Sequence, residues 1–392
     1  MFELKEIFAK QFIKALENHG ASVYLVGGCV RDYFQKLTPK DIDFIVCNLH
    51  YEEICEILEQ YGKVDLVGKS FGVIKFAESK TGFDCEIALP RADKKDENSS
   101  GHKGIIAETD PFMPLENDLL RRDFTINSIA MNSDGEVIDP FGGLTHLKEG
   151  IIEATNLNAF SDDPLRMLRA IQFAARFNFK IETKTFDLIV QHSHLIKDVS
   201  AERILIEFEK VFSKNGNINN FVSNLISTRL FKQIFGGGLF HPKYINFYDV
   251  KTLSELLFYF ICENPAIYNK VEFLQTKLKI DNDTAKQIKA FEKYFSTSIS
   301  SEYEQNKLCF DVFQICPKII QFNIVKKPFE EYLSNGFPIS YRNLAIDGIQ
   351  LMRLGYIGVE IGVKQREILD AILKRKIQNN YLLIKDFLQK KA

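Results

Sequence analysis

The sequence predicts an α+β protein in which a small head of alternating strands and helices precedes a region made only of helices. Up to about residue 145, short apolar runs that fit strands alternate with amphipathic helical stretches, and paired glycines interrupt them. From Asp163 onward, apolar residues recur almost everywhere with the 3.6-residue period of a helix. With 392 residues, 45% of them hydrophobic, the chain is long enough for two or more domains with buried cores.

The head is predicted to begin with a helix over residues 4–18 and to end at the Gly142-Gly143 break. Polar, irregular residues 90–116 predict a long loop, and loops of that length in compact domains are usually functional or mobile. The remaining elements are strands at Ser22–Val26, Asp41–Cys47, Lys63–Val67, Gly72–Phe76, Asp84–Leu89 and Val137–Ile138, and helices at Val30–Leu37, Tyr51–Gln60 and Asp118–Ala130.

Composition narrows the function classes. The 50 basic and 52 acidic residues give a net charge of -2, so any nucleic-acid surface must be local, and only residues 364–392 are notably basic. Seven scattered cysteines without a C-x-x-C pair argue against a disulfide framework or a zinc site. The first residues do not resemble a signal peptide and no apolar run reaches membrane-spanning length, so we expect a cytoplasmic protein without a membrane partner. No obligate protein partner is evident.

Two aspartates at the start of a predicted strand form a candidate metal site. In Asp41-Ile42-Asp43, the alternation of a strand puts both carboxylates on one face and Ile42 into the protein. Paired carboxylates suit Mg²⁺, which keeps waters and is usually shared with substrate phosphates. Glu86, on a later strand, can present a third carboxylate beside the pair. Judged alone, the pair fits a solvated strand end better than a metal site, and a lone glutamate on a strand, such as Glu86, more often faces solvent.

A glycine pair lies thirteen residues before these aspartates. Residues 27–32, with Gly27, Gly28, Arg31 and Asp32, join a strand to a helix. Glycines there let backbone N–H groups and the helix N-terminus approach a phosphate, and Arg31 adds a planar cation. Alone, the glycine pair fits a tight turn better, with Arg31 and Asp32 forming a surface ion pair. A phosphate cradle followed by metal carboxylates is, however, the order that nucleotidyl transfer needs.

Arg121-Arg122-Asp123 offers two guanidinium groups for a triphosphate and a carboxylate for a ribose hydroxyl. It equally fits the charged start of a helix.

A second charged segment, residues 162–169, is more informative. Pro164 is predicted to be the first residue of a helix, which makes Asp163 a candidate helix cap. Asp163 and Arg166 also lie on one face of that helix. An acceptor beside donors matches the Watson–Crick edge of cytosine and of adenine, whereas uracil and guanine present the reverse order. The pair therefore predicts selection of C and A over U and G.

In their order along the chain, these motifs resemble those of the class II tRNA nucleotidyltransferases and bacterial poly(A) polymerases, a branch of the polymerase β-like nucleotidyltransferases. The resemblance is clear from about residue 20 to 212, weaker over 213–335, and returns near residues 346–362. The matching segments are residues 26–32, 39–43, 120–127, 162–169 and 202–209.

The resemblance implies a polymerase β-like nucleotidyltransferase head with a mixed sheet (residues 1–145), then a helical neck that recognises the base (146–212), a helical body (213–335) and a helical tail that binds tRNA (336–392). It implies catalytic roles for Asp41, Asp43 and Glu86, with Asp41 and Asp43 as ligands of two Mg²⁺ ions. The residues implied to bind the nucleotide are Gly27, Gly28, Arg31, Asp32, Arg121, Arg122, Asp123, Asn127, Asp163, Arg166 and Arg169.

Two positions depart from the family pattern. Asp162 stands where Glu is usual, and Gln172 stands where many members carry Arg. Neither is an implied metal ligand, so the departures bear on phosphate grip or base preference. Some relatives also append a His-Asp phosphohydrolase domain, and because no His-Asp pair occurs among the seven histidines, we expect none here.

The function that the resemblance implies is metal-dependent addition of C, C and A to the 3' end of tRNA from CTP and ATP, with release of pyrophosphate. An enzyme that adds only the A and a poly(A) polymerase stay open as alternatives, and a non-catalytic RNA-binding relative is a distant one. Residues 90–117 resemble the loop of family members that switch from adding C to adding A, which disfavours an enzyme that adds only C. The sequence contains no extended basic segment that would bind RNA of any sequence, which disfavours a poly(A) polymerase. Full CCA addition is therefore the prediction.

Overall fold

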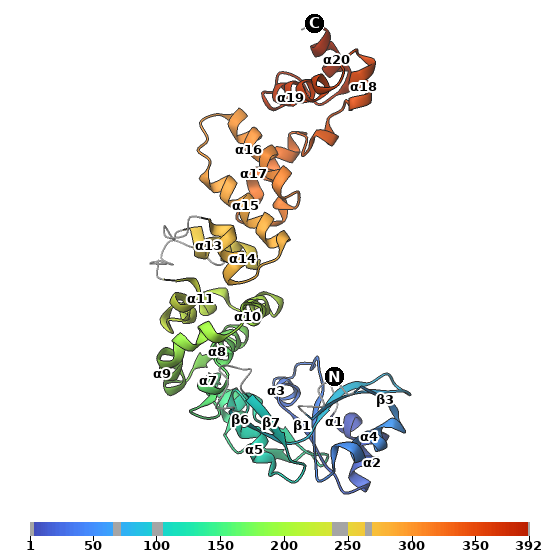
Figure 1. Cartoon of the computed structure of the whole chain (residues 1–392), viewed down its shortest axis with the longest axis vertical. Helices are drawn as coiled ribbons and strands as arrows, with labels where there is room; N and C mark the ends of the chain where they lie inside the picture. Colours follow the sequence, from blue (N-terminus) through green and yellow to red (C-terminus); the bar gives the residue numbers. More distant parts are fainter. Residues whose placement is uncertain (1–3, 66–71, 96–104, 237–249, 263–268, 391–392) are drawn as a thin grey trace. The chain divides into compact units, whose positions relative to one another are not determined.

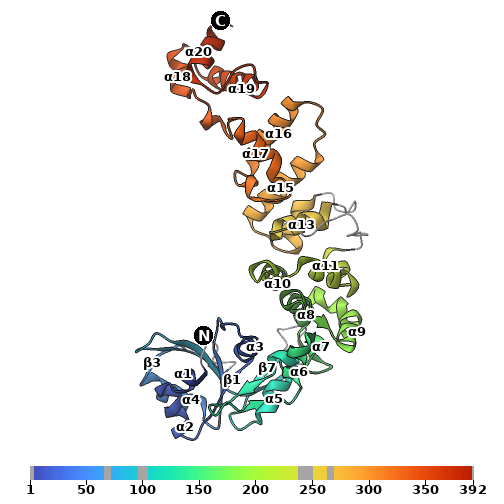
Figure 2. The same ribbon diagram turned by 180° about the vertical axis from the view of Figure 1, so that it is seen from behind.

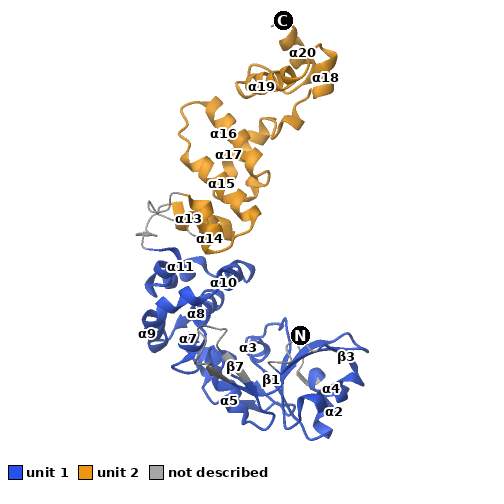
Figure 3. Ribbon diagram, in the orientation of Figure 1, with its two compact units in different colours: residues 1–236 blue, residues 237–392 orange. Residues whose placement is uncertain are grey.

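The computed structural model describes residues 4–65, 72–95, 105–236, 250–262 and 269–390. They belong to two compact units, residues 1–236 and 237–392 (Figure 3). The first unit contains α1 (Leu4–Phe8), α2 (Gln11–Asn18), β1 (Ser22–Val26), α3 (Gly28–Phe34), β2 (Asp43–Cys47), α4 (Tyr51–Glu59), β3 (Gly62–Asp65), β4 (Val73–Glu78), β5 (Asp84–Ala88), β6 (Arg91–Lys95), β7 (Ile105–Thr109), α5 (Leu115–Leu120), η3 (Thr125–Asn127), β8 (Ala130–Met131), β9 (Val137–Ile138), α6 (Gly143–Glu149), β10 (Ile151–Ile152), α7 (Ala159–Asp162), α8 (Leu165–Phe177), β11 (Lys180–Ile181), α9 (Thr183–His192), η4 (Ser193–Asp198), α10 (Ala201–Ser213), α11 (Ile218–Ser227) and α12 (Leu230–Phe235).

A seven-stranded mixed sheet forms the centre of the head, in the order β3-β4-β5-β2-β1-β8-β9. Only β2 and β5 pair in parallel within it, and the register of that pair places Asp43 opposite Glu86. The predicted mixed sheet followed by helices is thus confirmed.

One face of the sheet carries the core of the head. The apolar side of α2 buries Phe12, Ile13 and Leu16 completely, because these residues share one helical face. They pack with α4 against strand residues such as Phe44 and Phe76, and α2 and α4 lie together beside the sheet in Figure 1 and Figure 2. Ile42 is buried in this core, as the alternation predicted.

The opposite face of the sheet is only partly covered. Leu115 and Leu119 of α5 pack there on Val26, Ile45 and Cys47. Towards β4 and β5 the same face carries exposed charged side chains. The candidate functional site lies against this uncovered part of the sheet.

Several predicted elements of the head have different bounds. The helix over residues 4–18 is two helices, α1 and α2; the strand predicted from Asp41 begins at Asp43; and the helix predicted at Val30–Leu37 is α3, Gly28–Phe34. The predicted strands at Lys63–Val67, Gly72–Phe76 and Asp84–Leu89 are β3, β4 and β5, with Leu66 and Val67 outside the described residues.

Two predictions between residues 90 and 130 were wrong. The expected loop contains the antiparallel pair β6 and β7, with Arg91 opposite Thr109, and its residues 96–104 lie outside the described residues. The helix expected over 118–130 is replaced by the end of α5, the short η3 and strand β8. Strand β8 pairs with β1, so sheet pairing overrode the local helical pattern.

The helices that follow the head pack around α8. Its buried residues include Met167, Leu168 and Ile171, and α10 and α11 both contact it. The helix begins at Leu165 rather than at Pro164, and it ends at Phe177. The next residue, Asn178, has a φ of 55°, the left-handed conformation common after a helix.

In the described part of the second unit, every regular element is helical. Its core is rich in aromatic side chains, among them Phe258, Phe291 and Phe329. No helix among the described residues is both long enough and apolar enough to span a bilayer. The elements are α13 (Leu253–Cys262), α14 (Lys270–Lys277), α15 (Asn282–Ser296), α16 (Glu302–Ile315), η7 (Ile319–Gln321), α17 (Lys326–Ser334), η8 (Tyr341–Asn343), α18 (Gly348–Arg353), α19 (Val359–Leu373) and α20 (Tyr381–Gln389).

Candidate nucleotide-binding and catalytic site

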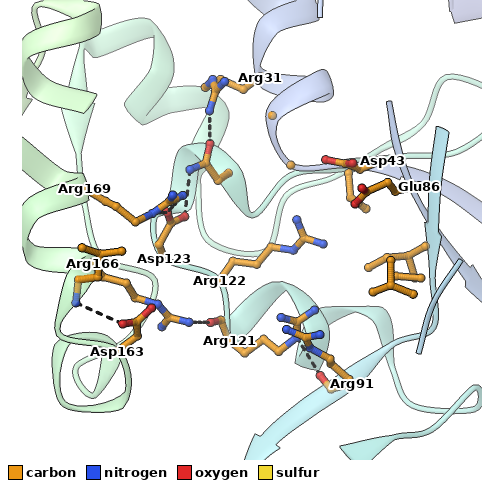
Figure 4. A pocket seen from close by; sticks show the side chains of 18 of the residues that line it. Arg31, Asp43, Glu86, Arg91, Arg121, Arg122, Asp123, Asp163, Arg166 and Arg169 are labelled. Atoms are coloured by element: carbon orange, nitrogen blue, oxygen red, sulfur yellow. Dashed lines mark hydrogen bonds and ion pairs between the residues drawn. The ribbon is translucent and has the colours of Figure 1, made fainter. Parts of the chain in front are cut away.

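A cavity of about 510 Å³ lies between the uncovered sheet face and helices α8 and α10. Figure 4 shows carboxylates on its sheet side and arginines around the rest of its wall. The wall includes Asp43 and Glu86 from the sheet, Arg91, Arg121 and Arg122 from the region of α5, and Asp163, Arg166, Arg169 and Arg203 from the helices. All lining residues belong to the first unit.

The two strand carboxylates face the cavity side by side, as the parallel register of β2 and β5 requires. Glu86 also lies 3.3 Å from the ammonium group of Lys75 on β4. Burial, and then the negative charge of Glu86, raise the pKa of Asp43 to about 6, while Arg122 acts in the opposite direction. When Asp43 and Glu86 are both ionised, the nearby cations do not fully neutralise their charge.

This donor set fits a magnesium ion shared with a substrate. The described residues contain no group of three or more His, Cys, Asp or Glu side chains arranged to hold a metal by themselves. Mg²⁺ is commonly held by one or two carboxylates together with water and substrate phosphates, and it would relieve the repulsion at Asp43. Asp41 precedes β2, is exposed, and lines two smaller neighbouring cavities instead of the main one.

The glycine turn brings backbone and arginine close together. Gly27 has a φ of +72°, and a Cβ at this position would lie 2.7 Å from Nη1 of Arg122. A side chain here would thus be strained and would also displace Arg122. Gly28 begins α3, and a Cβ there would lie 3.5 Å from Nη2 of Arg31, which is an ordinary contact.

Both arginines of the Arg121-Arg122 pair are held by one buried carboxylate. Asp118 is 0% exposed; its Oδ1 accepts from Nη2 of Arg121 at 2.6 Å and its Oδ2 from Nη2 of Arg122 at 3.1 Å. The two arginines hold the pKa of Asp118 below its usual value, against the opposing effect of burial. Arg122 points into the cavity toward the carboxylate side (Figure 4). Asp118 thus fixes two cations at the wall.

A chain of hydrogen bonds connects the glycine turn to the neck helices. Nε and Nη2 of Arg31 donate to Asp32 at 2.9 and 2.6 Å, and Nη1 donates to Asn127. Asn127 donates to Asp123 at 2.9 Å, and Asp123 accepts two bonds from Arg169 of α8 at 2.9 and 2.6 Å. The expected Arg31–Asp32 pair exists, but it is buried instead of lying on the surface.

The predicted base-reading pair consists of Asp163, just before α8, and Arg166, in the first turn of α8. The N-cap of α8 is Pro164, not the predicted Asp163, because α8 begins one residue later than expected. Oδ1 of Asp163 accepts from the N–H of Leu165 at 3.2 Å, and its Oδ2 accepts from Arg203 of α10 at 2.8 Å. The guanidinium of Arg166 donates to the carbonyl oxygen of Arg121 at 2.7 Å. Asp163 thus bonds to the first N–H of α8 and to Arg203, and it also lines the cavity.

The structure brings together every site residue named from the sequence except Asp32 and Asp41, which line an adjoining cavity. Sequence reasoning missed Asp118, Arg91 and Arg203. The spacing of Asp118 to Arg121 and Arg122, three and four residues, was a readable signal for a helical carboxylate clamp. Arg91 carried no comparable signal, because it lay in the segment interpreted as loop.

Two family models match parts of this chain. Residues 23–153 match the model of the poly A polymerase head domain, and residues 178–238 match a domain described as the probable RNA- and SrmB-binding site of polymerase A. The resemblance to this family that the motifs predicted is thereby confirmed for residues 23–153 and 178–238.

Among curated proteins, the chain is 36% identical over 225 residues to the CCA-adding enzyme of Anoxybacillus flavithermus. This alignment covers 57% of this chain and 54% of that protein. It is 39% identical over 197 residues to the multifunctional CCA protein of Haemophilus influenzae, which covers 49% and 44%. The chain thus spans about half the length of the curated relatives it matches.

Solved structures show the same fold over nearly the whole chain. The CCA-adding enzyme of Bacillus stearothermophilus in complex with CTP superimposes with a TM-score of 0.75 at 21% identity, over 100% of this chain and 98% of that one. The Thermotoga maritima CCA-adding enzyme complexed with tRNA gives a TM-score of 0.73 at 22% identity, over 99% and 98%.

Proposed function

We propose that this chain is a nucleotidyltransferase that adds C, C and A to the 3' end of tRNA from CTP and ATP. The observation that carries the proposal is one cavity in which two strand carboxylates face a wall of arginines. A triphosphate needs such cations, and nucleotidyl transfer needs carboxylates at the reacting phosphorus. The relatives named CCA-adding enzyme and multifunctional CCA protein support CCA addition, and the solved CCA-adding enzyme complexed with tRNA supports the tRNA substrate.

The chain's own residues would bind and orient the nucleotide. Arg121 and Arg122, fixed by Asp118, would hold the triphosphate, and the backbone at Gly27 would let a phosphate approach. Asp123 would hold the ribose. Asp163 and Arg166 would read the base edge and reject U and G, because those bases would leave buried polar groups unpaired.

Asp41 and Asp43, with Glu86 beside them, would hold two Mg²⁺ ions. Bound there, the ions would lower the pKa of the RNA 3' hydroxyl and neutralise charge on the triphosphate. The hydroxyl oxygen forms a bond to the α-phosphorus, its proton is released, and the bond to the β-phosphate oxygen breaks, so that pyrophosphate leaves with the electron pair. The protein supplies the base-reading edge, and no nucleic-acid template is used.

The division into head (1–145), neck (146–212), body (213–335) and tail (336–392) belongs to this proposal. The cavity lies between head and neck residues, which supports a base-recognition role for the neck. The body and tail would bind tRNA. Addition of A alone and poly(A) synthesis remain the competing activities, and the sizes of the products distinguish them.

The carboxylates provide the first test. The full chain is incubated with Mg²⁺, labelled CTP or ATP, and a tRNA transcript lacking CCA. We expect Asp43→Ala to reduce incorporation at least about a thousandfold, with the folded state intact by circular dichroism. Asp134→Ala, at an exposed turn outside the cavity, is the matched control and should behave like the wild type. Incorporation by Asp43→Ala close to that of the control would exclude the proposal.

A further inference from the structure

Glu207 of α10 is a buried carboxylate that the proposed mechanism does not use. The residue is only 2% exposed. Its Oε1 accepts a hydrogen bond from Lys210 at 2.7 Å, whereas its Oε2 has no hydrogen-bond partner among the described residues. Nearly all buried polar atoms in folded proteins have a partner, because a buried acceptor without one is destabilising. The unpaired oxygen of Glu207 therefore needs an explanation.

Arg169 of α8 lies between Glu207 and a second buried carboxylate, that of Asp123. Its Nη1 is 3.9 Å from Oε1 of Glu207, which is too far for a hydrogen bond. Its Nε and Nη2 donate instead to Oδ2 of Asp123, at 2.9 and 2.6 Å (Figure 4). Arg169 is thus near both carboxylates and is hydrogen-bonded only to Asp123.

Asp123 has no acceptor position left for a ligand. Its Oδ1 accepts from the N–H of Phe124 and from Nδ2 of Asn127, both at 2.9 Å, and its Oδ2 accepts both bonds from Arg169. A carboxylate has about four lone-pair sites, so all of them are in use. The ribose contact that we assign to Asp123 therefore requires one of these donors to leave.

Among these donors, Arg169 is the one with another acceptor beside it. The N–H of Phe124 is fixed by the chain itself, because Phe124 directly follows Asp123. Asn127 is held at its other end, since its Oδ1 accepts from Arg31. Arg169, in contrast, adjoins Glu207, which has an unpaired oxygen. A guanidinium that leaves Asp123 can therefore form new hydrogen bonds without becoming unpaired.

We propose that Glu207 is a positioning residue that binds Arg169 when a nucleotide enters the site. A ribose hydroxyl donates to Oδ2 of Asp123, and the guanidinium turns from that oxygen to Glu207. The inference rests on the proposed nucleotidyl transfer, because it takes the ribose contact of Asp123 from it. Since a guanidinium has several N–H donors, Arg169 held by Glu207 can still donate to the nucleotide.

The test compares ribose recognition by the wild type and by Glu207→Gln. Affinities of the full chain for CTP, 2'-deoxy-CTP and 3'-deoxy-CTP are measured by calorimetry with Mg²⁺ and without RNA. Glu207→Gln keeps the size of the side chain and removes its charge. Glu209→Gln is the matched control, because Glu209 is exposed on the same helix and does not line the nucleotide cavity.

We expect the wild type and Glu209→Gln to bind CTP about tenfold more tightly than at least one of the deoxy forms, because that form lacks the hydrogen bond to Asp123. In Glu207→Gln the preference should fall below about twofold, since Arg169 stays on Asp123 and the hydroxyl finds no acceptor. A merely structural role for Glu207 would weaken the binding of all three nucleotides equally.

Arg169→Met provides a second test that does not depend on the folding of Glu207→Gln. Methionine has no N–H donor, so Oδ2 of Asp123 is open in this variant. We expect Arg169→Met to prefer CTP over the same deoxy form at least as strongly as the wild type does. The preference should also return when Arg169→Met is added to Glu207→Gln, because Glu207 acts through Arg169.

Three results would overturn the inference. The first is a ribose preference in Glu207→Gln equal to that of the wild type. The second is loss of the preference in Arg169→Met, which would make Arg169 the ribose contact instead of Asp123. The third is a wild type without any preference for CTP over the deoxy forms. Failure of the proposed function would appear differently, as a wild type that prefers CTP but adds no nucleotide to a tRNA transcript.

Discussion

At the residue scale, the carboxylates of the sheet face repel each other. Asp43 and Glu86 are neighbours across the parallel pair of β2 and β5, and Asp43 is partly buried. Active sites commonly hold like charges at a cost in stability, because substrate or metal neutralises them during the reaction.

Replacing one of these charges should therefore stabilise the metal-free protein. We expect Asp43→Asn to raise the free energy of unfolding by about 1 kcal/mol at pH 7, measured by denaturant titration in the presence of a chelator. Asp134→Asn removes a charge at an exposed turn and should change the free energy of unfolding by less than about 0.5 kcal/mol. If Asp43→Asn lowers the free energy of unfolding in the presence of the chelator, the repulsion between the carboxylates does not significantly destabilise the protein.

Asp118 has the opposite character, because it is buried and paired with two arginines. Removing its charge leaves both guanidinium groups without their partner. We expect Asp118→Asn to lower the free energy of unfolding by about 2–4 kcal/mol and to weaken binding of CTP and ATP by at least about tenfold. Denaturant titration and nucleotide titration measure these effects. Glu116→Gln, exposed on the same helix, is the control. Unchanged nucleotide affinity in Asp118→Asn would remove Asp118 from the site.

The arginine-paired carboxylates also predict the response to acid. The pKa values of Asp118 and Asp123 are held below the usual 3.8 by Arg121, Arg122 and Arg169. Because the folded values are lower than the unfolded ones, the stability they contribute is complete above pH 3.8 and is lost as pH falls toward the folded values. We expect a steep decrease in the free energy of unfolding below about pH 4, and a shallower decrease in Asp118→Asn. Parallel curves for the two proteins would contradict this.

At the element scale, the turn between β1 and α3 depends on one glycine. Gly27→Ala combines an unfavourable positive φ with a collision with Arg122. We expect it to weaken nucleotide binding by about tenfold and to lower the free energy of unfolding by about 1–3 kcal/mol. Gly20→Ala is the matched control, because Gly20 also has a positive φ, of 96°, but nothing lies within 4 Å of its Cβ position. Equal nucleotide affinity in the two variants would show that Arg122 is not displaced.

The sequence predicted the elements unevenly, for physical reasons. Strands such as Ser22–Val26 and the helix at Tyr51 were recognised because their apolar residues have the right period. The pair β6 and β7 was missed because β6 is mostly charged and lacks a strand pattern, and because the short apolar run that begins β7 was included in the surrounding polar segment. Residues 118–130 looked helical, but tertiary pairing of β8 with β1 ended the helix.

The candidate site was more predictable than its supporting contacts. Glycines, aspartates and arginines in a fixed order pointed to the cavity because those residue types carry the chemistry. The partners that hold them depend on packing between distant segments. Examples are the pairing of Asp163 with Arg203, the bond from Arg31 to Asn127 and the bond from Arg166 to the backbone of Arg121. Local spacing gives no signal for such contacts.

At the scale of the whole molecule, the nucleotide cavity lies entirely within residues 1–236. We expect a fragment of residues 1–236 to bind CTP and ATP within about threefold of the full chain, since it contains every lining residue. Its affinity for a tRNA transcript should fall by at least about tenfold, because phosphate contacts of the second unit would be lost. Calorimetry and RNA titration measure the two affinities. A folded fragment with full tRNA affinity would show that the second unit does not bind tRNA.

The most direct measurement of the central claim is the size of the products made from tRNA transcripts that end before CCA, after C, or after CC. Purified full-length chain and Mg²⁺ are supplied with CTP and ATP, singly and together. We predict discrete completion to CCA from every ending when both nucleotides are present. A single A added only after CC would identify an A-adding enzyme, and long A tails a poly(A) polymerase. Absence of any metal-dependent addition would contradict the assignment as a nucleotidyltransferase.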